Sequence, residues 1–116
     1  MEIKFLLATN DRAALRRWLE ENHQRERECW VTAYRGKQPM PDALPYLEVV
    51  EEALCFGWID STVKRLPDGR LAQRISPRRK GSHWTELNIR RCQNLEATGL
   101  LTEAGRMVMP KKTITT

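Results

Sequence analysis

The chain has 116 residues, 41% of them hydrophobic and 30% charged, with a formal net charge of +5 at pH 7. This length and composition are typical of one soluble globular domain that buries a small core. The chain has no run of about 18 apolar residues, which excludes a membrane-spanning helix, and its three unclustered cysteines argue against a disulfide framework.

The basic balance of the chain, with a sequence pI of about 9.4, suits an anionic partner such as nucleic acid, a nucleotide or an acidic protein. A solvated basic surface is the other interpretation, because pI alone shows no patch. The first residues lack the long apolar region of a signal peptide, so we expect a cytoplasmic protein.

Hydrophobic periodicity and helix-stop residues predict an alternation of helices and strands. Thr9, Asn10 and Asp11 are good helix caps, Gly57 and Gly99 are typical helix terminators, and Pro67-Asp68-Gly69 predicts a hairpin turn. In chain order we expect a short strand at 3–7, a helix from about 11 to 27, a strand at 30–34, a loop at 36–45, a helix at 46–56, a hairpin with strands at 58–65 and 70–76, a helix from about 83 to 97, and a short helix at 103–109.

The apolar residues of the hairpin predict its register. If Leu66 faces Arg70, then Asp60 faces Ser76, and Ile59, Val63, Leu71 and Ile75 gather on one face. The opposite face then carries Trp58, Asp60, Thr62, Lys64, Ala72, Arg74 and Ser76, with Asp60 and Arg74 as diagonal neighbours.

These elements predict an α+β fold: a small antiparallel sheet with a central hairpin, and about four helices packed on one face. We expect residues 1–109 to form a single domain and residues 110–116 to form a flexible tail. An exposed edge strand could pair with a second copy, so a homodimer and a monomer are both compatible with the sequence.

Two features of the sequence predict a binding site. The first is a set of charges, Asp60, Lys64, Arg74, Arg78, Arg79 and Lys80, whose loop cations precede a helix N-terminus and could hold a phosphate or carboxylate. A purely structural salt bridge between Asp60 and Arg74 is the competing interpretation. The second is Asn88, an amide within an apolar stripe, which either holds a loop or orients a ligand. Trp58 and Trp84 are aromatic candidates beside the cations, with core packing as the alternative for both.

The central residues resemble a known family. The stretch Glu51-Glu52-Ala53-Leu54-Cys55-Phe56-Gly57-Trp58-Ile59-Asp60-Ser61, together with Val63-Lys64, Ala72-Gln73-Arg74, Ser76-Pro77-Arg78-Arg79, Gly81-Ser82, Trp84 and Asn88-Ile89, is similar to the YdeI/OmpD-associated (bacteriocin-protection) family. The match is dense from Tyr46 to about Arg106. The resemblance implies a role in protection against bacteriocins or cationic antimicrobial peptides, and it implies no particular reaction.

We therefore expect a cytoplasmic, non-enzymatic binding protein of a bacterial stress or antimicrobial-protection system, with a basic anion-binding face. The ligand-binding residues would be Trp58, Asp60, Lys64, Arg74, Arg78, Arg79, Trp84 and Asn88, with no cofactor and no metal. The alternatives are a small enzyme or sensor that acts on a phosphorylated or carboxylated metabolite at an Asp60/Arg74/Asn88 pocket, and a nucleic-acid binder.

Overall fold

The computed structural model describes residues 2–79 and 81–110, and it contains a mixed five-stranded sheet. The strand order is β1-β2-β5-β4, and β3 also pairs with β2. Lys80 and residues 111–116, on which part of the predicted basic loop and most of the predicted tail fall, lie outside the described residues. The strands are β1 (Leu6–Leu7), β2 (Cys29–Tyr34), β3 (Leu44–Pro45), β4 (Trp58–Arg65) and β5 (Leu71–Pro77).

The sheet is mainly antiparallel, as predicted, because β5 pairs in that sense with both β2 and β4. Two short pairings along the other edge of β2 are parallel, those with β1 and with β3. The side chain of Thr32 joins these two strands, because its hydroxyl contacts the carbonyl oxygens of Leu7 and Asp42.

The predicted hairpin register is right for one half of β4 and wrong for the other. Val63, Lys64 and Arg65 pair with β5 as expected, but the register shifts between Asp60 and Val63, so that Asp60 lies opposite Ile75 and not Ser76. One extra residue in β4 makes a β-bulge here. The buried Gln73 side chain donates to the carbonyl oxygens of Ser61 and Thr62, 3.2 and 3.3 Å away, which stabilises the bulge.

The bulge decides which side chains share a face. Directly paired residues lie on the same face of a sheet and successive residues on opposite faces. Asp60 therefore shares the face of Ile75, whereas Arg74 lies on the other face. The predicted common face for Asp60 and Arg74 is wrong for this reason, and Ile59 likewise departs from the apolar set of Val63, Leu71 and Ile75.

The helices begin at side-chain caps in three of four cases. Asp11, Thr85 and Thr102 each accept a hydrogen bond from a backbone amide of the first turn, whereas the second helix follows Pro45 without a side-chain cap. The first helix ends at Asn22, several residues before the predicted end. The helices are α1 (Arg12–Asn22), α2 (Tyr46–Cys55), α3 (Glu86–Ala97) and α4 (Glu103–Val108).

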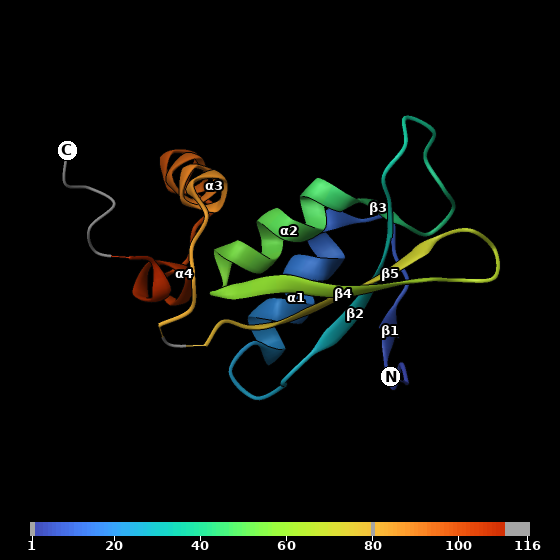
Figure 1. Ribbon diagram of the computed structural model, residues 1–116, viewed down its shortest axis with the longest axis horizontal. Coiled ribbons are helices and arrows are strands. Elements are labelled where there is room, and N and C mark those ends of the chain that lie inside the picture. Colours follow the sequence, from blue (N-terminus) through green and yellow to red (C-terminus); the bar gives the residue numbers. More distant parts are fainter. Residues whose placement is uncertain (1, 80, 111–116) are drawn as a thin grey trace.

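Helix α2 is the centre of the packing. It contacts β2, β4 and β5 of the sheet and also each of the other three helices. Figure 1 shows α1 and α2 side by side against the sheet, with α3 and α4 beyond the end opposite the β4–β5 turn. The packing of all four helices on one face stays a prediction. No helix in the described part of the chain combines the length and apolar character that crossing a bilayer requires.

The core lies between α1, α2 and the sheet. Its members are almost fully shielded from solvent, and the indole of Trp58 meets that of Trp18 edge to face at a centroid distance of 5.8 Å. The largest buried apolar side chains of this core are Leu15, Leu19, Val31, Leu44, Val49, Val50, Leu54, Trp58 and Ile75.

Close backbone contacts attach α4 to the end of α2. A Cβ atom added at Gly105 would lie only 2.6 Å from the carbonyl oxygen of Cys55, and one added at Gly57 would lie 2.9 Å from that of Ala104. The amide of Thr102 also donates to the carbonyl oxygen of Cys55. These contacts fix the position of the chain that follows α4, which borders the candidate site described next.

Candidate functional site

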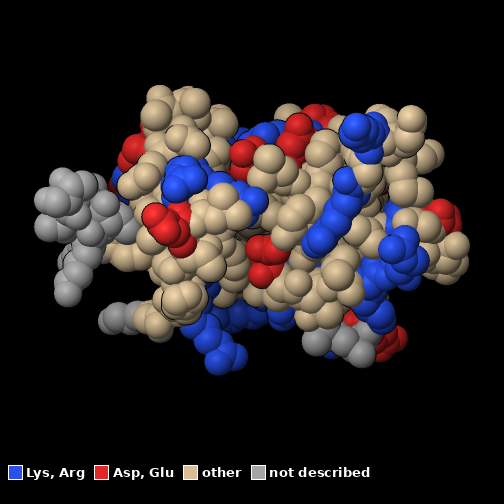
Figure 2. All heavy atoms as spheres, turned by 45° about the horizontal axis from the view of Figure 1, so that its top comes forward, with Lys and Arg blue, Asp and Glu red and all other residues tan. Residues whose placement is uncertain are grey.

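A cleft rich in arginine lies where β5 ends. Its volume is about 540 Å³, and four of its eight described lining residues are arginines while none is acidic. Figure 2 shows Lys and Arg side chains along part of the lower edge of the molecule and toward its right-hand end, with Asp and Glu side chains scattered over the same face. We call this cavity the arginine cleft; its lining residues are Arg27, Ile59, Arg74, Ser76, Pro77, Arg78, Arg79 and Ser82.

Several segments of the chain form the arginine cleft. Arg27 precedes β2, Ile59 lies in β4, and Arg74 and Ser76 lie in β5. The amide of Arg78 donates to the carbonyl oxygen of Gly57 at 3.0 Å, which holds the chain leaving β5 beside the start of β4. The amide of Ser82 donates to the carbonyl oxygen of Arg79, and this turn brings the Ser82 hydroxyl back to the cleft.

The guanidinium of Arg78 has an unusual environment. Its Cζ lies 3.8 Å from the centroid of the Trp84 ring, and Nη1 donates to the Ser82 hydroxyl at 2.9 Å and to the carbonyl oxygen of His83 at 3.1 Å. Its Nε is buried and has no hydrogen-bond partner among the described residues. Burial lowers the pKa of Arg78 below its ordinary value. Within the described residues this partly desolvated cation forms no ion pair with a carboxylate, an arrangement that an incoming anion would stabilise.

Arg74 is held in place by an ion pair outside the cleft. Its Nε lies 2.7 Å from the Glu28 carboxylate, and Nη1 contacts the hydroxyls of Ser61 at 3.1 Å and Ser76 at 3.5 Å. Glu28 does not line the cleft, whereas Arg74 does. The ion pair therefore anchors the Nε edge of the Arg74 guanidinium from outside the cavity. Arg27 and Arg79 are exposed and add charge at the rim.

The predicted site residues separate into two places. Arg74, Arg78 and Arg79 line the arginine cleft, and Trp84 borders it through its contact with Arg78. Asp60 instead accepts a hydrogen bond from the Tyr46 hydroxyl at 2.5 Å, on the other face of the sheet from Arg74. The expected contact between Asp60 and Arg74 is not made, because the bulge in β4 separates them.

The remaining predicted residues lie outside the arginine cleft. The Asn88 side-chain oxygen accepts from Arg91 at 2.9 Å, one turn further along α3. Lys64 lies on the exposed part of β4, and Trp58 is buried in the core, with its Nε1 donating to the carbonyl oxygen of His23.

Sequence reasoning missed Arg27 as a member of the cleft. This residue belongs to the charged run Arg25-Glu26-Arg27-Glu28, which has no apolar pattern. Arg27 can be assigned to the cleft only once the strand pairing is known. Cys29 lies opposite Ile75, so the residues before Cys29 approach the end of β5.

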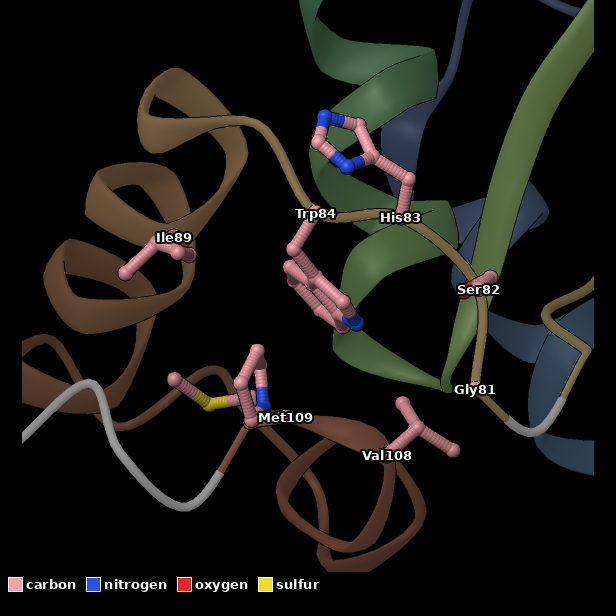
Figure 3. Close-up of a pocket in the computed structure, with 8 residues that line it drawn as sticks. Gly81, Ser82, His83, Trp84, Ile89, Val108 and Met109 are labelled. Atoms are coloured by element: carbon pink, nitrogen blue, oxygen red, sulfur yellow. The ribbon is translucent and has the colours of Figure 1, made fainter.

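A second cavity adjoins the arginine cleft. It has a volume of about 680 Å³, and Ser82 lines both cavities. Figure 3 shows the Trp84 indole directed toward α4, between Ile89 of α3 and Val108, whereas the His83 imidazole points the opposite way. We call this cavity the tryptophan groove; its lining residues are Gly81, Ser82, His83, Trp84, Ile89, Val108, Met109 and Pro110.

The described residues offer little for metal binding or nucleophilic catalysis. No group of three or more His, Cys, Asp and Glu side chains in 2–79 and 81–110 could hold a metal ion. All three cysteines are buried, and burial raises the pKa of Cys29 to about 12 and those of Cys55 and Cys92 to about 11. Such thiols stay protonated at neutral pH and are poor nucleophiles.

Comparison with known proteins gives one match. The model of a family described as "Domain of unknown function (DUF8412)" matches residues 7–108, a range that includes every described residue of the arginine cleft. No curated protein matches the chain, and no solved structure matches it either.

Proposed function

The chain belongs to the DUF8412 family, whose description assigns no activity, and we propose from the geometry of the arginine cleft that it is a binding protein for a small anion. The observation that carries this proposal is Arg78, a partly buried cation whose Nε has no hydrogen-bond partner and which forms no ion pair in residues 2–79 and 81–110. Desolvating a charge costs free energy, and an anion bound beside it would recover that cost.

The other cleft residues support the same function. Arg27, Arg74 and Arg79 add three cations around the cavity, and the hydroxyls of Ser76 and Ser82 add hydrogen-bonding groups. A guanidinium binds phosphate or carboxylate through two parallel hydrogen bonds, and an anion of two or more charges would satisfy several arginines at once. We therefore expect a compact phosphate-type ligand to bind in the cleft.

The resemblance to the YdeI/OmpD-associated family extends the proposal to a biological setting. We propose that this anion binding serves a bacterial stress or antimicrobial-peptide protection system in the cytoplasm. The enzyme alternative stays a prediction, but the expected pocket changes, because Asp60 contacts Tyr46 and lies on the other face of the sheet from Arg74. The nucleic-acid alternative keeps the basic charge in its favour and is tested by the same titration with an oligonucleotide.

The experiment is a calorimetric titration with inorganic pyrophosphate. The double variant Arg27→Ala/Arg79→Ala removes two exposed cleft cations whose side chains make no hydrogen bond or ion pair within the described residues, so it should keep the wild-type melting temperature and lose at least tenfold in affinity. The matched control is Arg17→Ala/Arg90→Ala, which removes two exposed arginines outside the cleft and should bind as the wild type does.

The titration can contradict the proposal in two ways. If pyrophosphate does not bind to the wild type, the cleft is not an anion site. If both double variants weaken binding equally, net charge and not the cleft is responsible. Binding of a single-stranded oligonucleotide at physiological salt, without binding of pyrophosphate, would favour the nucleic-acid alternative.

A further inference from the structure

The arginine cleft and the tryptophan groove adjoin each other, and one residue belongs to the lining of both. Ser82 lines both cavities, and the stacked pair of Arg78 and Trp84 stands between them, with Arg78 lining the cleft and Trp84 lining the groove. A ligand whose charged group contacts Arg78 therefore has apolar surface within reach on the far side of Ser82.

The chemistry of the two cavities differs. The arginine cleft offers guanidinium and hydroxyl groups, whereas the tryptophan groove offers the side chains of Trp84, Ile89, Val108, Met109 and Pro110. Figure 3 shows the Ile89, Val108 and Met109 side chains arranged around the Trp84 ring. An apolar group that covers the apolar side chains of an open groove removes them from water, and this burial favours binding.

We propose that the two cavities form one site for a small amphipathic anion: a soluble phosphate monoester whose phosphate binds in the arginine cleft and whose apolar body lies in the tryptophan groove. This inference rests on the anion binding proposed above and adds the ligand class. A single molecule can contact both cavities because Ser82 lines both, and Arg78 of the cleft lies directly against the ring of Trp84 in the groove. Charge complementarity selects the head group, and the apolar wall selects the body.

The position of Trp84 gives the site a further property. Its ring is already held against Arg78 at 3.8 Å, so the groove wall is positioned before a ligand arrives. A preformed wall reduces the ordering cost of binding. Each further carbon atom that the apolar body buries should therefore multiply the affinity by a similar factor.

The test compares methyl phosphate with hexyl phosphate, which carry the same head group and charge. Burial of one methylene favours binding about threefold to fourfold, so hexyl phosphate should bind the wild-type chain at least tenfold more tightly even if only part of the alkyl chain is covered. The variant Ile89→Gln should lose most of this difference and keep the affinity for methyl phosphate.

The matched control is Leu87→Gln, on the same helix but outside the groove, where the side chain is 53% exposed. It should preserve the preference for hexyl phosphate. Melting temperatures of both variants show whether each folds; should Ile89→Gln not fold, Met109→Gln removes apolar groove surface that comes from the end of α4.

The outcomes separate the two proposals. If methyl and hexyl phosphate bind with equal affinity, the amphipathic ligand is wrong and the anion-binding proposal stands. If neither binds and pyrophosphate does not bind either, the anion-binding proposal itself fails. Binding to vesicles of phosphatidic acid without binding to hexyl phosphate would also overturn the assignment of a soluble ligand.

Discussion

Arg78 lies over the ring of Trp84, with 3.8 Å between its Cζ and the ring centroid, while its Nε is buried without a partner among the described residues. The stacked ring orients the guanidinium, and the hydroxyl of Ser82 fixes one of its nitrogens. A cation held in this way by neutral groups keeps its capacity to bind an anion, whereas one paired with a carboxylate has already used it.

The identity of the side chain at position 78 should matter more than its charge. Lysine keeps the positive charge but cannot stack as a plane or donate two parallel hydrogen bonds. We expect Arg78→Lys to weaken pyrophosphate binding about tenfold, measured by calorimetry. Arg79→Lys, at an exposed rim position, should weaken it less than about threefold. Equal effects of the two substitutions would mean that position 78 acts only as a charge.

The bulge in β4 should depend on the Gln73 amide. Gln73→Leu keeps the approximate size of the side chain but leaves the carbonyl oxygens of Ser61 and Thr62 without their donor. Each lost hydrogen bond costs about 0.5–1.5 kcal/mol net, so we expect a loss of about 1–3 kcal/mol in the free energy of unfolding from urea titration. Gln93→Leu, at an exposed position of α3, should change it by less than about 0.5 kcal/mol. A neutral Gln73→Leu variant would show that the bulge does not need the amide.

The buried carboxylate of Glu52 should be essential for the joint between α1 and α2. Its side chain is 2% exposed and contacts Arg12 at 2.6 Å and Arg16 at 3.1 Å. Glu52→Gln leaves two arginines without their shared partner, and we expect a loss of about 3 kcal/mol in the free energy of unfolding. Glu20→Gln removes a carboxylate that is 56% exposed and should cost well under 1 kcal/mol. Similar losses in the two variants would contradict this difference in burial.

The three buried thiols should be unreactive in the folded chain. Their pKa values are raised to about 12 for Cys29 and about 11 for Cys55 and Cys92, so at pH 8 only about 0.1% of each or less is thiolate. Raised pKa values favour the protonated thiols of the folded state, and this contribution to stability is complete below the unfolded-state pKa and is lost as pH rises through 11–12. A thiol reagent at pH 8 should label all three in urea and label none rapidly without it. Rapid labelling of one cysteine in the native chain would contradict its burial.

Local rules predicted the elements well, because each depends on a short stretch of sequence. The cap Asp11, the terminators Gly57 and Gly99, and the turn at Pro67-Asp68-Gly69 all lie where the sequence indicated helix ends and a hairpin. The parallel pairing of β1 and β3 with β2 was not predictable, since two-residue strands carry no periodicity.

The site was predicted in part. Arg74, Arg78 and Arg79 come together as the hairpin and its basic loop suggested, but Asp60 does not join them. The alternation of Ile59, Val63, Leu71 and Ile75 favoured an uninterrupted register, and nothing local marks the extra residue at Ser61 and Thr62. The bulge is contacted by the buried amide of Gln73 on the neighbouring strand β5, which is a tertiary contact.

The most direct test of the central claim is an NMR titration that observes the arginine Nε–H groups while pyrophosphate is added. Those of Arg74 and Arg78 should shift together and saturate with one binding constant, whereas those of Arg70 and Arg106, which pair with Asp68 and Glu96 outside the cleft, should stay unchanged. Shifts of equal size at all four residues, or no saturation at Arg78, would contradict an anion site in the arginine cleft.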